Sequence, residues 1–249
     1  MTKKLQKQVQ YFGASVKGPL HQREGRSNED AWKGICGTFG TGIVVSDGMG
    51  SKPNAHTGAH MACKAVKNAL QYWSKFNGAS PVVLLRLVHI LWALQVLPAS
   101  EENSAATCLF AVVLPSGELV VAKLGDGIAA IRETDGKVIV LGDERSGFCN
   151  ETTALGIARS TKEWSVITRP SFLPGTAVLL ATDGIADDLV SDRVGDFINF
   201  LTEEFASMQP ALRWRTLCHE LRNWSTPKHL DDKTLAILWH QKDDFGSAS

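Results

Sequence analysis

The spacing of hydrophobic and polar residues changes several times along this chain, and each change predicts a different kind of element. Short apolar runs bounded by glycine, proline or aspartate predict strands at 9–16, 31–36, 42–46, 107–114, 118–124, 128–132, 137–141, 165–168, 177–181 and 234–239. Apolar residues spaced by three and four predict helices at 55–76, 81–97, 192–206 and 210–224. Ser191 is the expected N-cap of the third of these helices.

The order of these elements predicts the α+β class. Strands are followed by two helices, then by many strands, two more helices and a last strand. This order favours a four-layer α-β-β-α sandwich, in which two antiparallel sheets pack face to face with helices on both outer faces. The four strands between 107 and 141 are expected to form one antiparallel meander. Without an internal repeat or linker, we expect a single domain over 1–249, with a core at about 10–240 and a frayed tail at 243–249.

Composition and charge exclude several classes of protein. The chain has 26 basic and 26 acidic residues and no basic stripe, which argues against a nucleic-acid-binding protein. Its five cysteines form no CxxC pair, which is typical of a reducing compartment. No apolar stretch follows the basic N-terminus, and the apolar segment 81–98 is interrupted by Arg86 and His89. We therefore expect a cytoplasmic protein that does not enter a membrane.

Aspartates lie at the ends of predicted strands, where a charged side chain contributes nothing to a hydrophobic core. Such carboxylates repel one another if the strand ends converge, and divalent cations would relieve that repulsion. Oxygen ligands without histidine or cysteine favour hard ions such as Mg²⁺ or Mn²⁺. An isolated Asp-Gly is more often a turn, and we assign Asp135 to a hairpin turn for that reason. The remaining candidates are Asp30, Asp47-Gly48, Asp126-Gly127, Asp183-Gly184 and Asp231-Asp232.

Six short motifs occur in an order that resembles a known family. They are Asn28-Glu29-Asp30-Ala31, Val45-Ser46-Asp47-Gly48-Met49-Gly50, Leu124-Gly125-Asp126, Ala154-Leu155-Gly156, Ala181-Thr182-Asp183-Gly184 and Asp231-Asp232-Lys233-Thr234. Each motif alone is weak, but the ordered set resembles the type 2C metal-dependent serine/threonine protein phosphatases, in a divergent bacterial branch. The resemblance covers about residues 10–240. That family's fold is a sandwich of two antiparallel sheets flanked by helices, in agreement with the elements predicted above.

The resemblance implies a site with two Mg²⁺ or Mn²⁺ ions. Asp47 would bridge the two ions, and the Gly48 carbonyl would bind one of them. Asp183 and Asp231 would complete the coordination of the other ion. The implied reaction is the hydrolysis of phosphoserine and phosphothreonine by a water molecule that bridges the ions.

The resemblance also assigns residues around these ions. Glu29 and Asp30 would hold metal-bound waters or bind at the edge of the site. Asp126 matches an aspartate that binds a weaker third ion in bacterial relatives, although Gly127 replaces the usual serine after it. The segment 143–153 corresponds to a flap beside the site, and it contains Cys149, which we expect to be a plain thiol.

The chain departs from the family pattern at the residues that would handle the substrate. Phosphate binding is left open between Arg26, Arg23 and His21, and Arg26 is favoured. Met49 replaces the histidine proposed as a general acid in animal enzymes, so the acid is unassigned. Asp232 replaces the usual asparagine, where its charge would either tighten metal binding or face solvent.

These observations predict a phosphoprotein phosphatase, which we expect to be monomeric and to act on a serine/threonine kinase or on the target of such a kinase. Two alternatives remain: a small-molecule phosphomonoesterase of the same fold, and a non-catalytic module that binds phosphoproteins. Two further residue groups receive structural interpretations. His56 and His60 are expected on a helix surface, and the helical tryptophans are expected in the core: Trp73, Trp92, Trp214 and Trp224.

Overall fold

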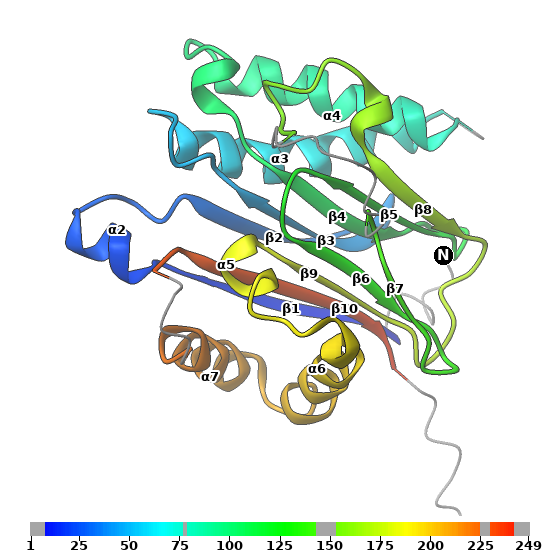
Figure 1. Cartoon of the computed structure of the whole chain (residues 1–249). Helices are drawn as coiled ribbons and strands as arrows, with labels where there is room; N and C mark the ends of the chain where they lie inside the picture. The colour runs from blue at the N-terminus through cyan, green and yellow to red at the C-terminus, as the bar shows by residue number, and fades with distance from the viewer. Residues whose placement is uncertain (1–7, 77–78, 143–152, 225–229, 242–249) are drawn as a thin grey trace, which may run out of the picture.

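The computed structural model describes residues 8–76, 79–142, 153–224 and 230–241. Two five-stranded sheets form its centre, and neighbouring strands within each sheet run antiparallel. The sheets pack face to face, and helices cover the outer face of each (Figure 1). The predicted four-layer α+β sandwich is confirmed.

The two sheets draw their strands from different parts of the chain. The first sheet has the order β1-β10-β9-β6-β7, with β1 Val9–Val16, β10 Lys233–His240, β9 Ala177–Ala181, β6 Ile128–Arg132 and β7 Val138–Val140. The second sheet has the order β2-β3-β4-β5-β8, with β2 Asp30–Gly37, β3 Gly40–Asp47, β4 Cys108–Val113, β5 Leu119–Leu124 and β8 Ser165–Arg169.

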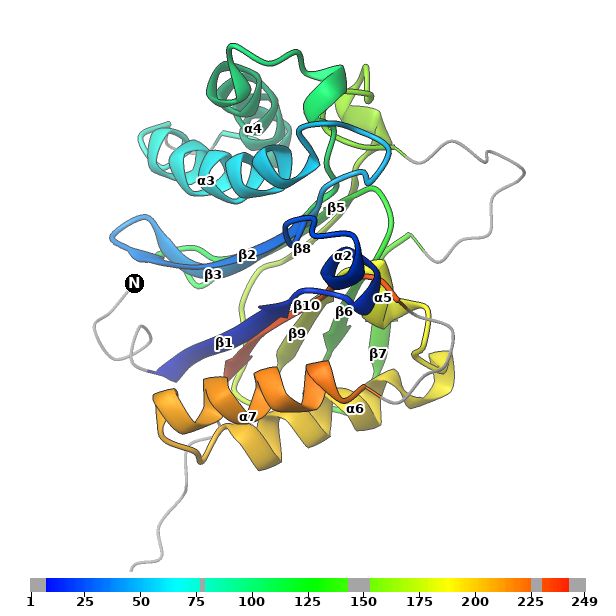
Figure 2. The ribbon, with the colours of Figure 1, turned by 90° about the vertical axis from the view of Figure 1, so that its left-hand side faces the viewer.

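Two helices cover each sheet, as the views in Figures 1 and 2 show. The second sheet is covered by α3 (Ala55–Trp73) and α4 (Pro81–Val96). The first sheet is covered by α6 (Val194–Phe200) and α7 (Pro210–Arg222). Two short helices that the hydrophobic pattern did not predict lie at one end of the sheets: α2 (Pro19–Arg23) and α5 (Asp183–Ala186). Short 3₁₀ turns occur at Glu102–Ser104, Thr161–Glu163 and Ser191–Arg193.

The strands bury both faces, which accounts for their nearly continuous apolar sequences. In β4, Phe110 and Val112 point to the layer under α3 and α4, whereas Leu109 and Ala111 point between the sheets. A strand with two buried faces cannot alternate apolar and polar residues, because successive side chains point to opposite faces. The same arrangement places Val44 under the helices and its neighbours between the sheets, as the run of residues 43–45 predicted.

The predicted meander of residues 107–141 is wrong. Its two hairpins exist, but β4 and β5 belong to the second sheet, whereas β6 and β7 belong to the first. The chain changes sheets at Gly125 and Gly127, which have φ values of +90° and +88°. These left-handed conformations favour glycine, and a side chain at Gly127 would lie 2.4 Å from the Ala181 carbonyl oxygen. Asp135 lies in the predicted hairpin turn, where one of its oxygens accepts a hydrogen bond from the Lys137 amide.

The helix predicted at 192–206 is divided into a 3₁₀ turn, α6 and a π-helical turn at Leu201–Phe205. The Thr202 hydroxyl donates to the carbonyl oxygens of Ile198 and Asn199, each at 3.0 Å, and such bonds compete with the regular helical ladder. Ser191 is not an N-cap, because it is the first residue of the 3₁₀ turn and Val190 occupies the N-cap position.

Three of the four helical tryptophans pack as predicted. Trp73 and Trp92 are buried, and Trp224 packs against the layer of α6 and α7. Trp214 is 54% exposed, so the core assignment is wrong for this residue. Within the described ranges, none of the helices has the length and apolar character needed to cross a bilayer.

Candidate active site

Two carboxylates from each sheet meet at one end of the sandwich. Asp30 begins β2 and Asp47 ends β3, and the antiparallel register makes them cross-strand partners. Asp183 follows β9 as the first residue of α5, and Asp231 lies two residues before β10. Because β9 and β10 are neighbours paired at Ala181, their aspartates share the same end of the first sheet. Strand pairing therefore brings two aspartates together in each sheet, and the charges of Asp183 and Asp231 act on Asp47 across the sandwich.

The electrostatics of the four groups identify them as one cluster. Burial raises the pKa of Asp47 well above its usual value, and the charges of Asp30, Asp183 and Asp231 raise it further. The pKa of Asp183 is raised by burial and then by Asp231. Burial also raises the pKa of Asp30 to about 8, although the Thr182 hydroxyl donates to its Oδ2 at 2.8 Å and opposes the shift. Asp30, Asp47 and Asp183 are thus costly to ionise without a cation nearby.

This donor set fits hard divalent cations. The converging groups are all carboxylates, three of which have raised pKa values, and oxygen-rich sites of this kind bind Mg²⁺ or Mn²⁺. The backbone at Gly48 is also held closely, because its amide donates to the Glu29 carbonyl at 3.0 Å. A side chain at Gly48 would lie 2.3 Å from the Ala55 carbonyl oxygen, so only glycine lets α3 approach β3 here.

Asp126 is exposed in the turn between β5 and β6. The next residue, Gly127, packs against the Ala181 carbonyl, two residues before Asp183. Asp126 is therefore at the same end of the sheets as Asp183.

Asp232 is buried, and its two oxygens are fully engaged with protein groups. Its Oδ1 accepts from the Gly18 amide at 2.6 Å, and its Oδ2 accepts from the Glu29 amide at 2.6 Å and lies 2.9 Å from His21 Nδ1. His21, Asp231 and Asp232 each have a ligand atom close enough to the others to hold an ion. The hydrogen bonds of Asp232, however, already connect it to groups at α2 and at the start of β2. Of the two alternatives for Asp232, the one in which it faces solvent is wrong, since it is 2% exposed.

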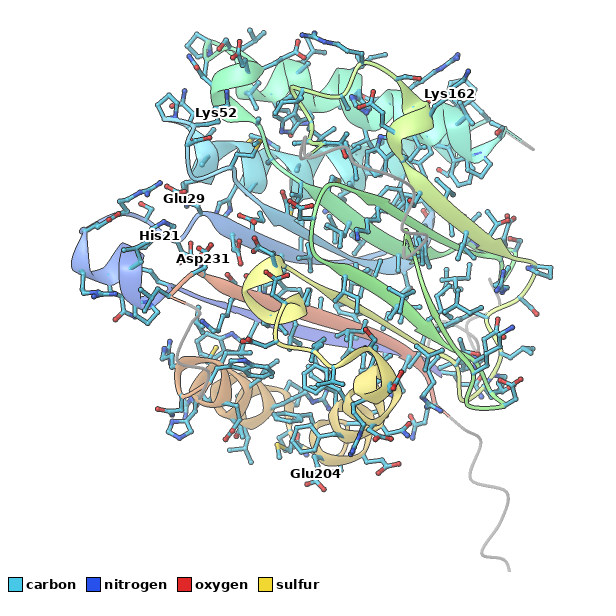
Figure 3. All side chains as sticks on the ribbon, viewed as in Figure 1. His21, Glu29, Lys52, Lys162, Glu204 and Asp231 are labelled. Carbon is cyan, nitrogen blue, oxygen red and sulfur yellow. The ribbon has the colours of Figure 1, made fainter. Side chains whose placement is uncertain are left out.

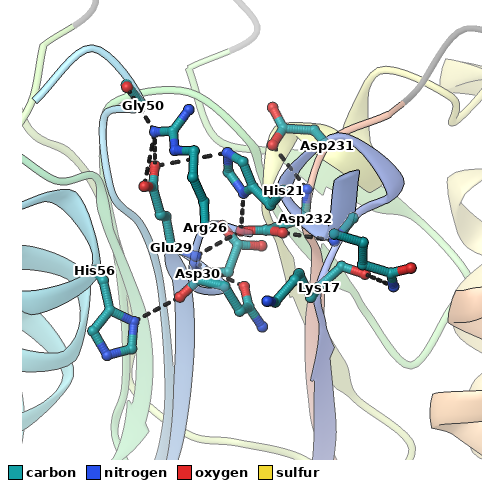
Figure 4. A network of polar contacts seen from close by, with 12 residues as sticks. Lys17, His21, Arg26, Glu29, Asp30, Gly50, His56, Asp231 and Asp232 are labelled. Atoms are coloured by element: carbon teal, nitrogen blue, oxygen red, sulfur yellow. Dashed lines mark hydrogen bonds and ion pairs between the residues drawn. The ribbon is translucent and has the colours of Figure 1, made fainter. Parts of the chain in front are cut away.

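A connected polar network joins this buried aspartate to the surface (Figure 4). His21 Nε2 lies 3.9 Å from Glu29 Oε2. Both Glu29 oxygens accept from Arg26 Nη2, at 2.8 and 2.9 Å, and the same nitrogen donates to the Gly50 carbonyl at 2.9 Å. Figure 3 shows His21, Glu29 and Asp231 at the same end of the sheets. The carboxylate of Glu29 is therefore paired with an arginine in this structure.

Of the three residues left open for phosphate binding, Arg26 has the most suitable position. It is partly exposed and lines a hollow of about 460 Å³ together with Glu29, Gly50, Lys52 and His56. By contrast, His21 is buried and hydrogen-bonded. The exposed Arg23 donates from Nε to the Pro19 carbonyl at 3.3 Å, within its own short helix.

Several residues that support the cluster gave no signal in the sequence. The Thr107 hydroxyl accepts from the Asp47 amide at 2.9 Å, and the Ser46 hydroxyl donates to the Thr107 carbonyl at 2.6 Å. The Thr182 hydroxyl accepts from the Thr234 amide at 3.1 Å while it donates to Asp30. Hydroxyl residues at strand ends are too common for sequence alone to single these out. The predicted flap at 143–153, with Cys149, lies outside the described residues except for Thr153.

Comparisons with known proteins agree with this geometry. Two curated relatives, the protein phosphatase PTC7 homologue fig of Drosophila simulans and of Drosophila melanogaster, are 27% identical over 201 residues. The alignment covers 74% of this chain and 62% of each relative, so the chain spans about three fifths of their length.

Solved phosphatase structures share the fold at low identity. The phosphatase MsPP of Mycobacterium smegmatis, in complex with cacodylate, has a TM-score of 0.61 and 19% identity, with 92% of this chain and 97% of that chain covered. The catalytic domain of PstP, with two manganese ions, has a TM-score of 0.59 and 16% identity, with 92% and 97% covered. The family described as protein phosphatase 2C matches residues 17–224, and this chain belongs to that family.

Proposed function

We propose that this protein is a metal-dependent phosphatase that removes phosphate from phosphoserine and phosphothreonine in proteins. The observation that carries the proposal is the cluster of Asp30, Asp47, Asp183 and Asp231, in which burial and neighbouring carboxylate charges raise the pKa values of Asp30, Asp47 and Asp183. A protein keeps such an unfavourable arrangement where cations are needed to neutralise it. Membership of the protein phosphatase 2C family supports the same activity.

The proposed ligands are those of the carboxylate cluster. Asp47 and the Gly48 carbonyl, with Asp183 and Asp231, would hold two Mg²⁺ or Mn²⁺ ions. Asp30 would act at the edge of the site, where the Thr182 hydroxyl fixes the direction of its carboxylate. When bound, the ions supply positive charge for the phosphoryl oxygens and lower the pKa of a water nucleophile.

Glu29 and Asp126 have lesser proposed roles. The bonds from Arg26 to both Glu29 oxygens favour contact of Glu29 with metal-bound water over direct ligation. The exposed position of Asp126 at this end of the sheets suits a ligand of a weaker third ion.

Substrate binding is assigned to Arg26. Glu29 and the Gly50 carbonyl bind one end of its guanidinium. Arg26 is therefore already partly ordered and loses less conformational entropy when it binds phosphate. Arg26 Nη1 is 3.5 Å from the exposed Glu24 carboxylate, a contact that an incoming phosphate can replace. We further propose that the substrate is a serine/threonine kinase or its target, and that the protein is a cytoplasmic monomer formed by a single domain.

Two other functions would use the same fold. A small-molecule phosphomonoesterase would hydrolyse metabolite esters in preference to phosphopeptides, so a comparison of kcat/KM for the two substrate types separates it from the proposed function. A non-catalytic binding module would retain phosphopeptides without hydrolysing them. The four intact carboxylates favour catalysis over this module.

The test is the hydrolysis of a phosphoserine peptide by the Asp183→Asn variant in saturating Mn²⁺. We expect kcat to fall by about 100-fold or more, because one ion loses a charged ligand while the amide keeps a similar shape. Asp135→Asn is a matched control, since it changes the aspartate of an Asp-Gly turn remote from the cluster, and it should keep full activity. Undiminished hydrolysis by a correctly folded Asp183→Asn variant would refute the assignment.

A further inference from the structure

Two histidines outside the carboxylate cluster lie against each other on α3. His56 and His60 are one helical turn apart, and their ring centroids are 4.4 Å apart with an interplanar angle of 53°. Both residues are exposed, which confirms the predicted position on a helix surface. Two histidines at positions i and i+4 on one helix face can bind the same metal ion.

A backbone carbonyl fixes the orientation of the first histidine. His56 Nδ1 lies 2.6 Å from the Asn28 carbonyl oxygen. A carbonyl oxygen can only accept, so Nδ1 carries the hydrogen and the Nε2 lone pair of the neutral ring remains available. Histidines that bind metals usually donate their other ring nitrogen to such a group, which holds the ring in place.

The second histidine favours the neutral form that binds metals. Burial, His56 and Lys33 lower the pKa of His60, in that order of importance. The ring is therefore uncharged at neutral pH, and metal binding requires little proton release. The Lys33 ammonium is the nearby positive charge that an ion at this position would have to tolerate.

We propose that His56 and His60 together bind one transition-metal ion, such as Cu²⁺, Ni²⁺ or Zn²⁺, at a site separate from the carboxylate cluster. Imidazole nitrogen suits these borderline ions, whereas Mg²⁺ prefers oxygen ligands. Two protein ligands leave the remaining coordination positions to water. His56 also lines the hollow that contains Arg26 and Glu29, so an ion here adds positive charge beside the candidate active site.

The experiment uses Cu²⁺ with the full chain in saturating Mg²⁺, so that the carboxylate cluster is occupied by its preferred ion. Calorimetric titration should show one Cu²⁺ bound per chain, and electron paramagnetic resonance should show coupling to two imidazole nitrogens. The His60→Gln variant leaves the contact of His56 with Asn28 in place and should weaken Cu²⁺ binding by at least 10-fold. His56→Gln should weaken it similarly.

A matched control is His219→Gln, which removes an exposed histidine from α7 and should change nothing. The proposal is overturned if Cu²⁺ does not bind, if its spectrum shows only oxygen ligands, or if His60→Gln binds as tightly as the unchanged protein. These outcomes are independent of the phosphatase activity, because calorimetry and electron paramagnetic resonance measure Cu²⁺ binding alone.

Discussion

Replacing Asp30 by asparagine should change how the stability of the metal-free protein depends on pH. The pKa of Asp30 is about 8 in the folded protein, compared with a usual value of 3.8. Between pH 5 and pH 7 the folded state therefore keeps a proton that the unfolded state has lost. The sign follows directly: stability is greatest at low pH and is lost as the pH rises towards the folded pKa.

Because the folded and unfolded states differ by one bound proton in this range, the free energy of unfolding changes by about 1.4 kcal/mol per pH unit. The free energy of unfolding of the unchanged protein should therefore fall by about 2.7 kcal/mol relative to Asp30→Asn between pH 5 and pH 7. The two proteins must be compared because the lowered pKa values of His60 and His89 make the free energy of unfolding rise with pH, which is the opposite sign. That contribution is present in both proteins and cancels in the difference.

The assay is urea denaturation of both proteins at pH 5, 6 and 7 in the presence of EDTA. The two stability profiles should diverge, with the asparagine variant gaining relative stability as the pH rises. A repeat in saturating Mg²⁺ should reduce the divergence, because bound cations favour the ionised carboxylate. Parallel profiles in EDTA would refute the reasoning that Asp30 is protonated in the folded metal-free protein.

Three further predictions concern metal dependence and packing. Removal of divalent ions with EDTA should abolish phosphopeptide hydrolysis, and added Mn²⁺ should restore it; activity that survives chelation would contradict the proposed reaction. Gly58→Ala should destabilise the protein by about 3 kcal/mol, because the added methyl carbon would lie 1.8 Å from the Ser104 carbonyl oxygen. Thermal unfolding of this variant beside Thr57→Ala, an exposed neighbour, checks the expectation. Leu179→Ala should cost about 2–5 kcal/mol in urea denaturation, because this fully buried side chain of β9 lies in the apolar layer between the first sheet and the helices α6 and α7; a smaller loss would mean that the layer collapses around the cavity.

The sequence predicted those parts of the fold that depend on short-range patterns. The strand β1 and the helix α4 were predicted to within about one residue at each end, because period and bounding residues act locally. The carboxylates at the ends of β3 and β9 were visible for a similar reason: a charged residue that interrupts an apolar strand has no place in a core.

The pattern failed where distant parts of the chain decide the conformation. Nothing local to residues 125–127 indicates that the chain leaves one sheet for the other. That step depends on the space beside the Ala181 carbonyl, to which the chain returns more than 50 residues later. Trp214 follows an apolar helical pattern, yet it is exposed because α7 has only one sheet face to cover.

The sequence by itself therefore determined the class of fold, the carboxylates available for chemistry and the family to which the chain belongs. Only the tertiary structure decided which of these groups act together. His21 and Asp232 are 211 positions apart in the chain and still form a buried pair, which leads through Glu29 to Arg26. Hydrophobic periodicity reports the burial of each segment, whereas hydrogen bonds between distant residues depend on the position and direction of atoms that only the packed sheets fix.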